Sequence, residues 1–320
     1  MTQDEKLIYL NEIVKTNFKS EYKGPLILYK YRPFDEYTFE MLENNYIFLC
    51  PAEKEDDETE CLTTTNLNEM LDPKTGNLSK KYLNKIVSLI KPSSTDKNYE
   101  IAKDKVFEIA DKEGTNPIIF NKDFAIELKK MAPEGTDVGP IIKAIENIPE
   151  MLNKPEMSKT LEPAFKLAID ARKKIGICSL AETNNIDYMW KNYAQESSGY
   201  CIEYDLNDYE LAKNILPVIY QDERETNIIV QFTGTMLGLL ICAISKGLIP
   251  ADASHFIRLF LTKYKKWEYQ NEWRYIGTAN DKPRSPKVKT IYLGKNVTAE
   301  NEQQMRKYAA LNNISVIKLN

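Results

Sequence analysis

The chain has 320 residues, of which 42% are hydrophobic and 28% charged, and its formal net charge is −4. These values are typical of a soluble globular protein with a sizeable core, and the net charge excludes an overall electrostatic drive toward nucleic acid. The charge is uneven, because residues 53–60 are acidic whereas residues 258–295 carry ten Lys and Arg against three acids. The basic stretch is either solvated surface or a surface that attracts phosphates.

Short apolar runs bounded by Pro or Gly indicate strands, and apolar residues at helical spacing indicate helices. Helices are predicted at residues 3–17, 36–44, 186–195, 226–247, 250–265 and 298–311. Strands are predicted at residues 26–32, 46–50, 175–180, 200–204, 215–220, 271–277, 288–293 and 314–319. This order predicts an α+β fold, with a mixed, mostly antiparallel sheet and helices packed on it.

One long segment differs in composition from its surroundings. Residues 65–170 are rich in lysine and repeatedly interrupted by proline, and they read as a helical insertion. We therefore predict a single split core domain, residues 1–64 and 171–320, with the insertion at residues 65–170.

Three features bear on the compartment. Thr226 to Ser245 is uncharged and would just span a bilayer, but polar residues dilute it, so a buried helix is the preferred interpretation. The charged N-terminus, with no long apolar stretch after it, does not resemble a signal peptide. The five cysteines contain no CxxC pair. Four of them sit in apolar runs and read as core thiols of a reducing cytosol: Cys50, Cys178, Cys201 and Cys242. These observations predict a cytoplasmic protein that does not enter a membrane.

Several kinds of chemistry lack the residues they need. There is one histidine, His255, and neither a P-loop nor a GxGxxG motif. Sites built on several His and Cys ligands and catalysis by a Ser-His-Asp triad are therefore disfavoured, and no metal is expected. An acidic set of Asp57, Glu60 and Glu272 leaves a metal-dependent nuclease as one hypothesis.

The segment Trp267 to Arg274 is the most informative motif in the chain. On a strand, Gln270, Glu272 and Arg274 would share one face, because side chains alternate with period two. An amide, a carboxylate and a guanidinium in a row between tryptophans need water, partners or a ligand. The structural alternative is that Glu272 forms a scaffold ion pair with Arg274 or with Arg32.

Four blocks of the sequence resemble a bacterial family known as domain of unknown function 2971. They are Leu28 to Arg32 with Tyr46 to Phe48, the acidic turn Pro51 to Glu60, Ile177 to Leu180 with Met189 to Ile202, and Trp267 to Arg274 with Ile291 to Gly294. Of the Asn-Asp-Pro-Phe-Glu turn usual in the family, this chain keeps only Asp57 and Glu60. Gln270 stands where the family often has Glu. The resemblance implies abortive infection or phage defence.

A weaker resemblance is to ADP-ribosyltransferases of the arginine–serine–glutamate kind. It implies NAD as substrate, with Arg32 on the phosphates, Ser179 at the nicotinamide ribose, Glu272 at the transition state and Gln270 at the acceptor. Further predicted NAD contacts are Lys30, Tyr31, Trp190, Tyr193 and Arg274. The structural alternatives are that Arg32 caps a carboxylate, that Ser179 bonds to backbone, and that Trp190 and Tyr193 belong to the core.

The sequence leaves three functions as hypotheses. The first is an NAD-dependent ADP-ribosyltransferase or NAD glycohydrolase that acts as a toxin, with a protein or nucleic acid as acceptor. The second is a non-catalytic module that binds a nucleotide or nucleic acid. The third is the metal-dependent nuclease.

Overall fold

The computed structural model describes residues 1–16, 18–54, 173–224, 226 and 255–320. The chain is divided into two compact units. The first comprises Met1–Cys61, Arg172–Arg224 and Leu261–Asn320, and the second comprises Leu62–Ala171 and Glu225–Phe260. The predicted insertion at residues 65–170 and the predicted helix at residues 226–247 lie outside the described residues. The first unit holds the sheet and the candidate site.

Most described strands of this unit form one eight-stranded sheet in the order β10-β9-β4-β1-β3-β8-β5, with β2 paired to β3. The strands are β1 (Ile27–Arg32), β2 (Cys50–Pro51), β3 (Ile175–Ala181), β4 (Tyr200–Asp205), β5 (Ile215–Pro217), β8 (Glu272–Thr278), β9 (Lys287–Leu293) and β10 (Ser315–Lys318). The β9–β10 pair is parallel and the others are antiparallel. The predicted α+β class with a mixed, mostly antiparallel sheet is confirmed.

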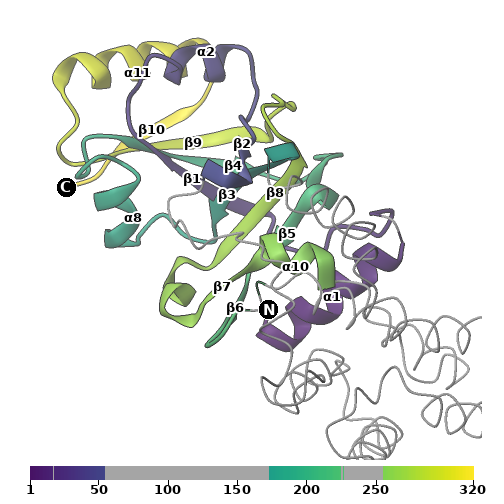
Figure 1. Cartoon of the computed structure of the whole chain (residues 1–320). Helices are drawn as coiled ribbons and strands as arrows, with labels where there is room; N and C mark the ends of the chain where they lie inside the picture. The colour runs from purple at the N-terminus through teal and green to yellow at the C-terminus, as the bar shows by residue number, and fades with distance from the viewer. Residues whose placement is uncertain (17, 55–172, 225, 227–254) are drawn as a thin grey trace, which may run out of the picture. The chain divides into compact units, whose positions relative to one another are not determined.

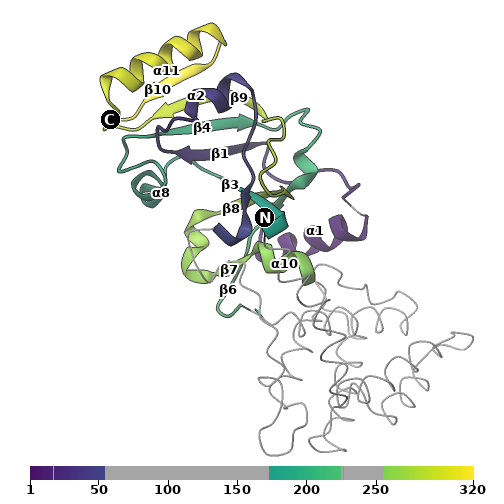
Figure 2. The ribbon, with the colours of Figure 1, turned by 45° about the horizontal axis from the view of Figure 1, so that its top comes forward.

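Helices lie on both faces of this sheet, as Figures 1 and 2 show. The described helical elements of the first unit are α1 (Gln3–Lys15), α2 (Thr38–Glu43), η1 (Ala52–Lys54), α8 (Asp187–Asn192), η4 (Ala212–Asn214), η5 (Lys265–Gln270) and α11 (Ala299–Leu311). Helix α10 (His255–Leu261) belongs mostly to the second unit. Helices α2 and α11 lie side by side, joined by the Tyr308 hydroxyl, which donates to Leu42 O at 3.0 Å. On the opposite face, α8 packs Trp190 against Tyr31.

Trp273 of β8 is the anchor for α1. Its side chain is fully buried, and Tyr9 and Tyr22 pack on it with ring centroids 6.4 and 6.1 Å away. Burial of so large an aromatic surface ties the N-terminal helix to the strand that begins at Glu272.

Several predicted elements are wrong in detail. The sequence predicts a strand at residues 46–50, but Tyr46 forms an isolated bridge to Arg284, and regular pairing begins at Cys50. The predicted helix at residues 250–265 ends at Leu261, after which β7 (Thr262–Tyr264) pairs in parallel with β6 (Ile219–Gln221). A short apolar run does not distinguish helix from strand by local pattern, and here the partner strand decides.

In the described helices, no segment is long and apolar enough to cross a membrane. Among the described cysteines, Cys178 and Cys201 are buried thiols, as predicted, whereas Cys50 is half-buried.

Candidate functional site

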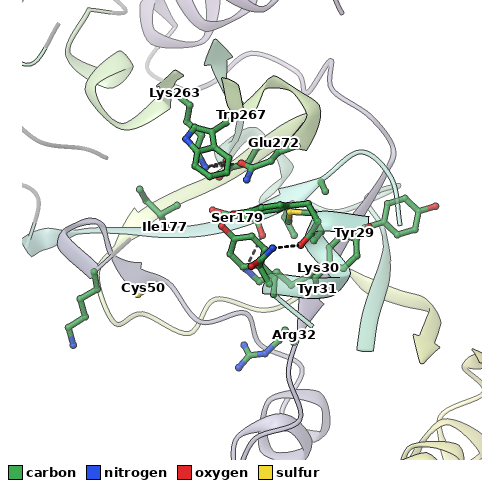
Figure 3. A pocket seen from close by; sticks show the side chains of 18 of the residues that line it. Tyr29, Lys30, Tyr31, Arg32, Cys50, Ile177, Ser179, Lys263, Trp267 and Glu272 are labelled. Carbon is green, nitrogen blue, oxygen red and sulfur yellow. Dashed lines mark hydrogen bonds and ion pairs between the residues drawn. The ribbon is translucent and has the colours of Figure 1, made fainter. Parts of the chain in front are cut away.

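A pocket opens in the sheet where β1 turns away from β3. Among the described strands, β1 pairs with β3 at Tyr29↔Ala181, and β2 pairs with the other end of β3 at Cys50↔Ile177. Between these two positions the edge of β3 faces a cavity of about 930 Å³ (Figure 3). Every residue that lines it belongs to the first unit.

Cations and aromatic rings dominate the lining of this pocket. The cations are Lys30, Arg32, Lys54, Lys263 and Lys266, and the acidic residue among the lining residues is Glu272. The aromatic residues are Tyr29, Tyr31, Phe48, Tyr188, Tyr193 and Trp267. Excess positive charge attracts anionic groups such as phosphates, and aromatic faces accept flat rings.

Glu272 lies at one end of the pocket between two cations. Arg274 Nε donates to Glu272 Oε1 at 2.7 Å, and Lys263 Nζ donates to Glu272 Oε2 at 2.7 Å. The same Lys263 Nζ donates to Gln270 Oε1 at 2.9 Å. Burial alone would lower the pKa of Lys263, but the adjacent Glu272 carboxylate outweighs it and raises the pKa above its ordinary value. The cluster therefore carries a net positive charge beside the cavity.

The turn at Asn271 explains how Gln270 and Glu272 converge. Gln270 ends η5 rather than lying on the strand, so the predicted shared strand face of Gln270, Glu272 and Arg274 is wrong. Asn271 has φ 43° and ψ 53°, a left-handed conformation that asparagine tolerates better than most residues. Lys263, rather than strand periodicity, joins the amide to the carboxylate.

Ser179, Lys30 and Tyr31 line the pocket, and their predicted roles toward NAD stay predictions. Register places Ser179 opposite Arg274, on the face that carries Glu272. Lys30 Nζ donates to Ser179 O at 2.9 Å, across the gap between β1 and β3. The Tyr31 hydroxyl donates to Thr183 O at 2.9 Å, which holds the loop that follows β3.

Arg32 occupies a different position from the one expected of a phosphate ligand. It lines the pocket, and the alternation along β1 puts it on the same face as Lys30 and on the face opposite Tyr31. Its Nη2 pairs with Asp35 at 2.9 Å, and Figure 3 shows the guanidinium at the far end from Glu272. The structural alternative, a guanidinium that caps a carboxylate, is what the geometry shows, and the role of Arg32 toward NAD stays a prediction.

Three further residues predicted to contact NAD differ in their position relative to the pocket: Trp190, Tyr193 and Arg274. Trp190 is 5% exposed, and its indole donates to Asn184 O at 2.6 Å, so it belongs to the core and not to the pocket lining. Tyr193 lines the pocket. Arg274 is fully buried and reaches the site through Glu272.

Sequence reasoning missed Lys263, Lys266 and Tyr188. Lys263 lies in a segment predicted to be helical, and nothing in the local pattern directs it nine residues forward to Glu272. The basic composition of residues 258–295 is the available signal, and it does not single out these lysines.

The nuclease hypothesis receives no support from the described residues. Among them, no group of three or more His, Cys, Asp or Glu side chains could hold a metal ion. Glu272 is held by two cations instead, and Asp57 and Glu60 lie outside the described residues.

Residues 189–275 match the model of a family described as protein of unknown function (DUF2971). The match runs from α8 to β8 and includes Lys263, Gln270, Glu272 and Arg274, and it confirms the family resemblance predicted from the sequence. No curated protein and no solved structure matches the chain.

Proposed function

We propose that the pocket binds NAD and that the protein cleaves the bond between nicotinamide and ribose, as an NAD glycohydrolase or an ADP-ribosyltransferase. One observation supports this most directly. Gln270, Glu272 and Ser179, from distant parts of the chain, line a single cavity together with lysines and aromatic rings. A carboxylate, phosphate-binding cations and stacking surfaces are the groups that this substrate calls for.

The chemistry needs little beyond these groups, because NAD carries its own leaving group. As the C1′–N1 bond breaks, its electron pair leaves with nicotinamide and positive charge develops on the ribose. A carboxylate at Glu272 stabilises that charge, and the lysines hold the pyrophosphate. Water or an acceptor nucleophile then bonds to C1′ and releases a proton. Ser179, on the same sheet face, can orient a ribose hydroxyl.

A second candidate, a non-catalytic nucleotide-binding module, is favoured by a specific contact pattern. Both oxygens of Glu272 already accept hydrogen bonds from cations, Lys263 and Arg274. Each cation weakens the field of the carboxylate at the ribose, while the net positive cluster strengthens phosphate binding. Under this alternative the pocket holds a nucleotide without breaking it.

Nicotinamide release from NAD by the purified full-length chain separates the two candidates. We expect release from the wild type and a loss of at least about a hundredfold in Glu272→Gln, the scale of one lost electrostatic stabiliser. Glu12→Gln, which changes an exposed carboxylate outside the pocket, is the matched control. Calorimetric binding of NAD without nicotinamide release would favour the second candidate, and undiminished release by Glu272→Gln would remove Glu272 from the chemistry.

The family resemblance adds a cellular proposal, that NAD loss acts as a toxin in phage defence. Expression of the wild type should then lower cellular NAD and arrest growth, while Glu272→Gln at equal expression should do neither. Growth arrest at unchanged NAD would contradict this role.

A further inference from the structure

Three aromatic side chains from two distant elements contact one another, and two of them, Tyr188 and Trp267, line the pocket. Tyr188 comes from α8, and Trp267 and Tyr269 come from η5. Their ring centroids lie 5.4 Å apart for Tyr188–Tyr269, 5.7 Å for Tyr188–Trp267 and 6.1 Å for Trp267–Tyr269. We call Tyr188, Trp267 and Tyr269 the aromatic rim.

The aromatic rim combines exposed rings with a buried polar atom that, among the described residues, lacks a partner. Tyr188 and Tyr269 are 38% and 41% exposed, although large aromatic rings gain stability from burial. Trp267 Nε1 is buried and, among the described residues, has no hydrogen-bond partner. A buried donor without a partner costs free energy and calls for an explanation, such as an acceptor that arrives with a ligand.

Positive charge accompanies these rings. Lys266 Nζ lies 5.2 Å from the Trp267 ring centroid, and Lys266 itself lines the pocket. Gln270 directly follows Tyr269 in the chain and accepts a hydrogen bond from Lys263 Nζ, so the rim adjoins the Glu272 cluster. A flat ligand on the rim would therefore lie next to a cation and close to the proposed reaction centre.

We propose that the aromatic rim is a binding site for an unstacked base of single-stranded nucleic acid. Every nucleobase has a flat face for stacking, carbonyl and ring-nitrogen acceptors for the indole N–H, and a neighbouring phosphate for Lys266. An unstructured polypeptide offers flat rings at few positions and no regular anionic backbone. Duplex nucleic acid keeps its base faces inside the stack, so it does not fit the same surface.

This site extends the proposed function, since it would place an acceptor base beside the pocket for NAD. Binding of the base depends on the rim and Lys266, not on the cleavage of NAD. The two can therefore fail separately: a chain that binds single strands but leaves NAD intact would refute the reaction alone.

Fluorescence anisotropy with a labelled single-stranded oligonucleotide of mixed sequence tests the site on the full-length protein. We expect Tyr269→Ala and Tyr188→Ala each to weaken binding about tenfold, within the range of base–aromatic stacking. Tyr269→Phe keeps the ring and should retain binding. Tyr37→Ala is the matched control, because Tyr37 is 56% exposed and lies outside the pocket. DNA and RNA probes run in parallel decide between the two sugar types.

A second readout covers the tryptophan. Trp190 and Trp273 are 5% and 0% exposed, so quenching of intrinsic fluorescence by the bound strand should come from Trp267 and vanish in Trp267→Phe. Lys266→Ala should flatten the dependence of affinity on salt by about one unit of log–log slope. The proposal is overturned if single strands do not bind, if the rim variants bind as tightly as the Tyr37 control, if the duplex binds equally well, or if an unstructured peptide displaces the strand at similar concentration.

Discussion

The most demanding prediction concerns Lys263→Met. This change removes the cation that holds both Gln270 and Glu272, while it keeps a side chain of similar length. Removal of one partner from a buried ion pair costs about 3–5 kcal/mol. Arg274 Nε still neutralises Glu272 at 2.7 Å, so we expect the lower end, about 3 kcal/mol of unfolding free energy.

Urea denaturation followed by tryptophan fluorescence suits this test, because all three tryptophans lie in the first unit. Lys282→Met is the matched control: Lys282 is 49% exposed, pairs with Glu40 at 3.0 Å and should cost less than about 1 kcal/mol. The double variant Lys263→Met with Glu272→Gln should lose about 1–3 kcal/mol less than the two single losses combined. A Lys263→Met cost no larger than that of Lys282→Met, or strict additivity, would refute the reasoning.

The dependence on pH supplies an independent check on the same pair. The folded-state pKa of Lys263 lies above its ordinary value of 10.5, because Glu272 favours the charged form by more than burial disfavours it. The pair therefore contributes its full stability below pH 10.5 and loses it as the pH rises toward the folded-state pKa. The stability difference between wild type and Lys263→Met should thus be constant from neutral pH to about 10 and shrink above it.

The same geometry supports three further predictions. Asn271→Val should cost about 1–2 kcal/mol of unfolding free energy, because a β-branched residue resists the left-handed conformation. Asn271→Gly should cost less than about 1 kcal/mol. Equal urea midpoints for the two variants would contradict this prediction. Lys6 is buried and burial lowers its pKa, so Lys6→Met should leave the unfolding free energy at pH 7 unchanged or raised. A loss of unfolding free energy as large as that of Lys263→Met would show that the two buried lysines do not differ in this way. Lys30→Met should raise the KM for NAD more than Arg32→Met does, since the Arg32 guanidinium is committed to Asp35; steady-state kinetics that show the reverse order would restore Arg32 as the phosphate ligand.

The sequence is sufficient to predict most of the sheet, and the reason is local. The runs at β1, β3, β4 and β9 are short, apolar and bounded by turn-forming residues, so pattern and propensity agree. The strand β7 could not be predicted, because its partner β6 is distant in the sequence and the residues before it are helical. Where a long-range pairing decides between helix and strand, local pattern is a poor guide.

The site shows the same division between local and long-range information. The sequence predicts that Gln270 and Glu272 lie close together on one strand face. They do lie close together, but the Asn271 turn and the two hydrogen bonds from Lys263 bring them together, not strand alternation. The ion pair of Glu272 with Arg274 is the structural alternative that the sequence suggested. The second cation is not predictable in this way, because a buried carboxylate requires a partner without indicating where in the chain that partner lies.

The electrostatic design of the cluster links this buried pair to the proposed ligand. A carboxylate flanked by two cations leaves one positive charge uncompensated within the cluster, and the other lining lysines add to it. Within a partly enclosed pocket that charge is screened less than on an open surface, so an anionic ligand should stabilise the folded unit. Loss of positive charge in Lys263→Met should therefore reduce the thermal stabilisation by NAD even where Glu272→Gln preserves it. Should both variants retain full stabilisation, the ligand does not use this charge and the site for phosphate lies elsewhere.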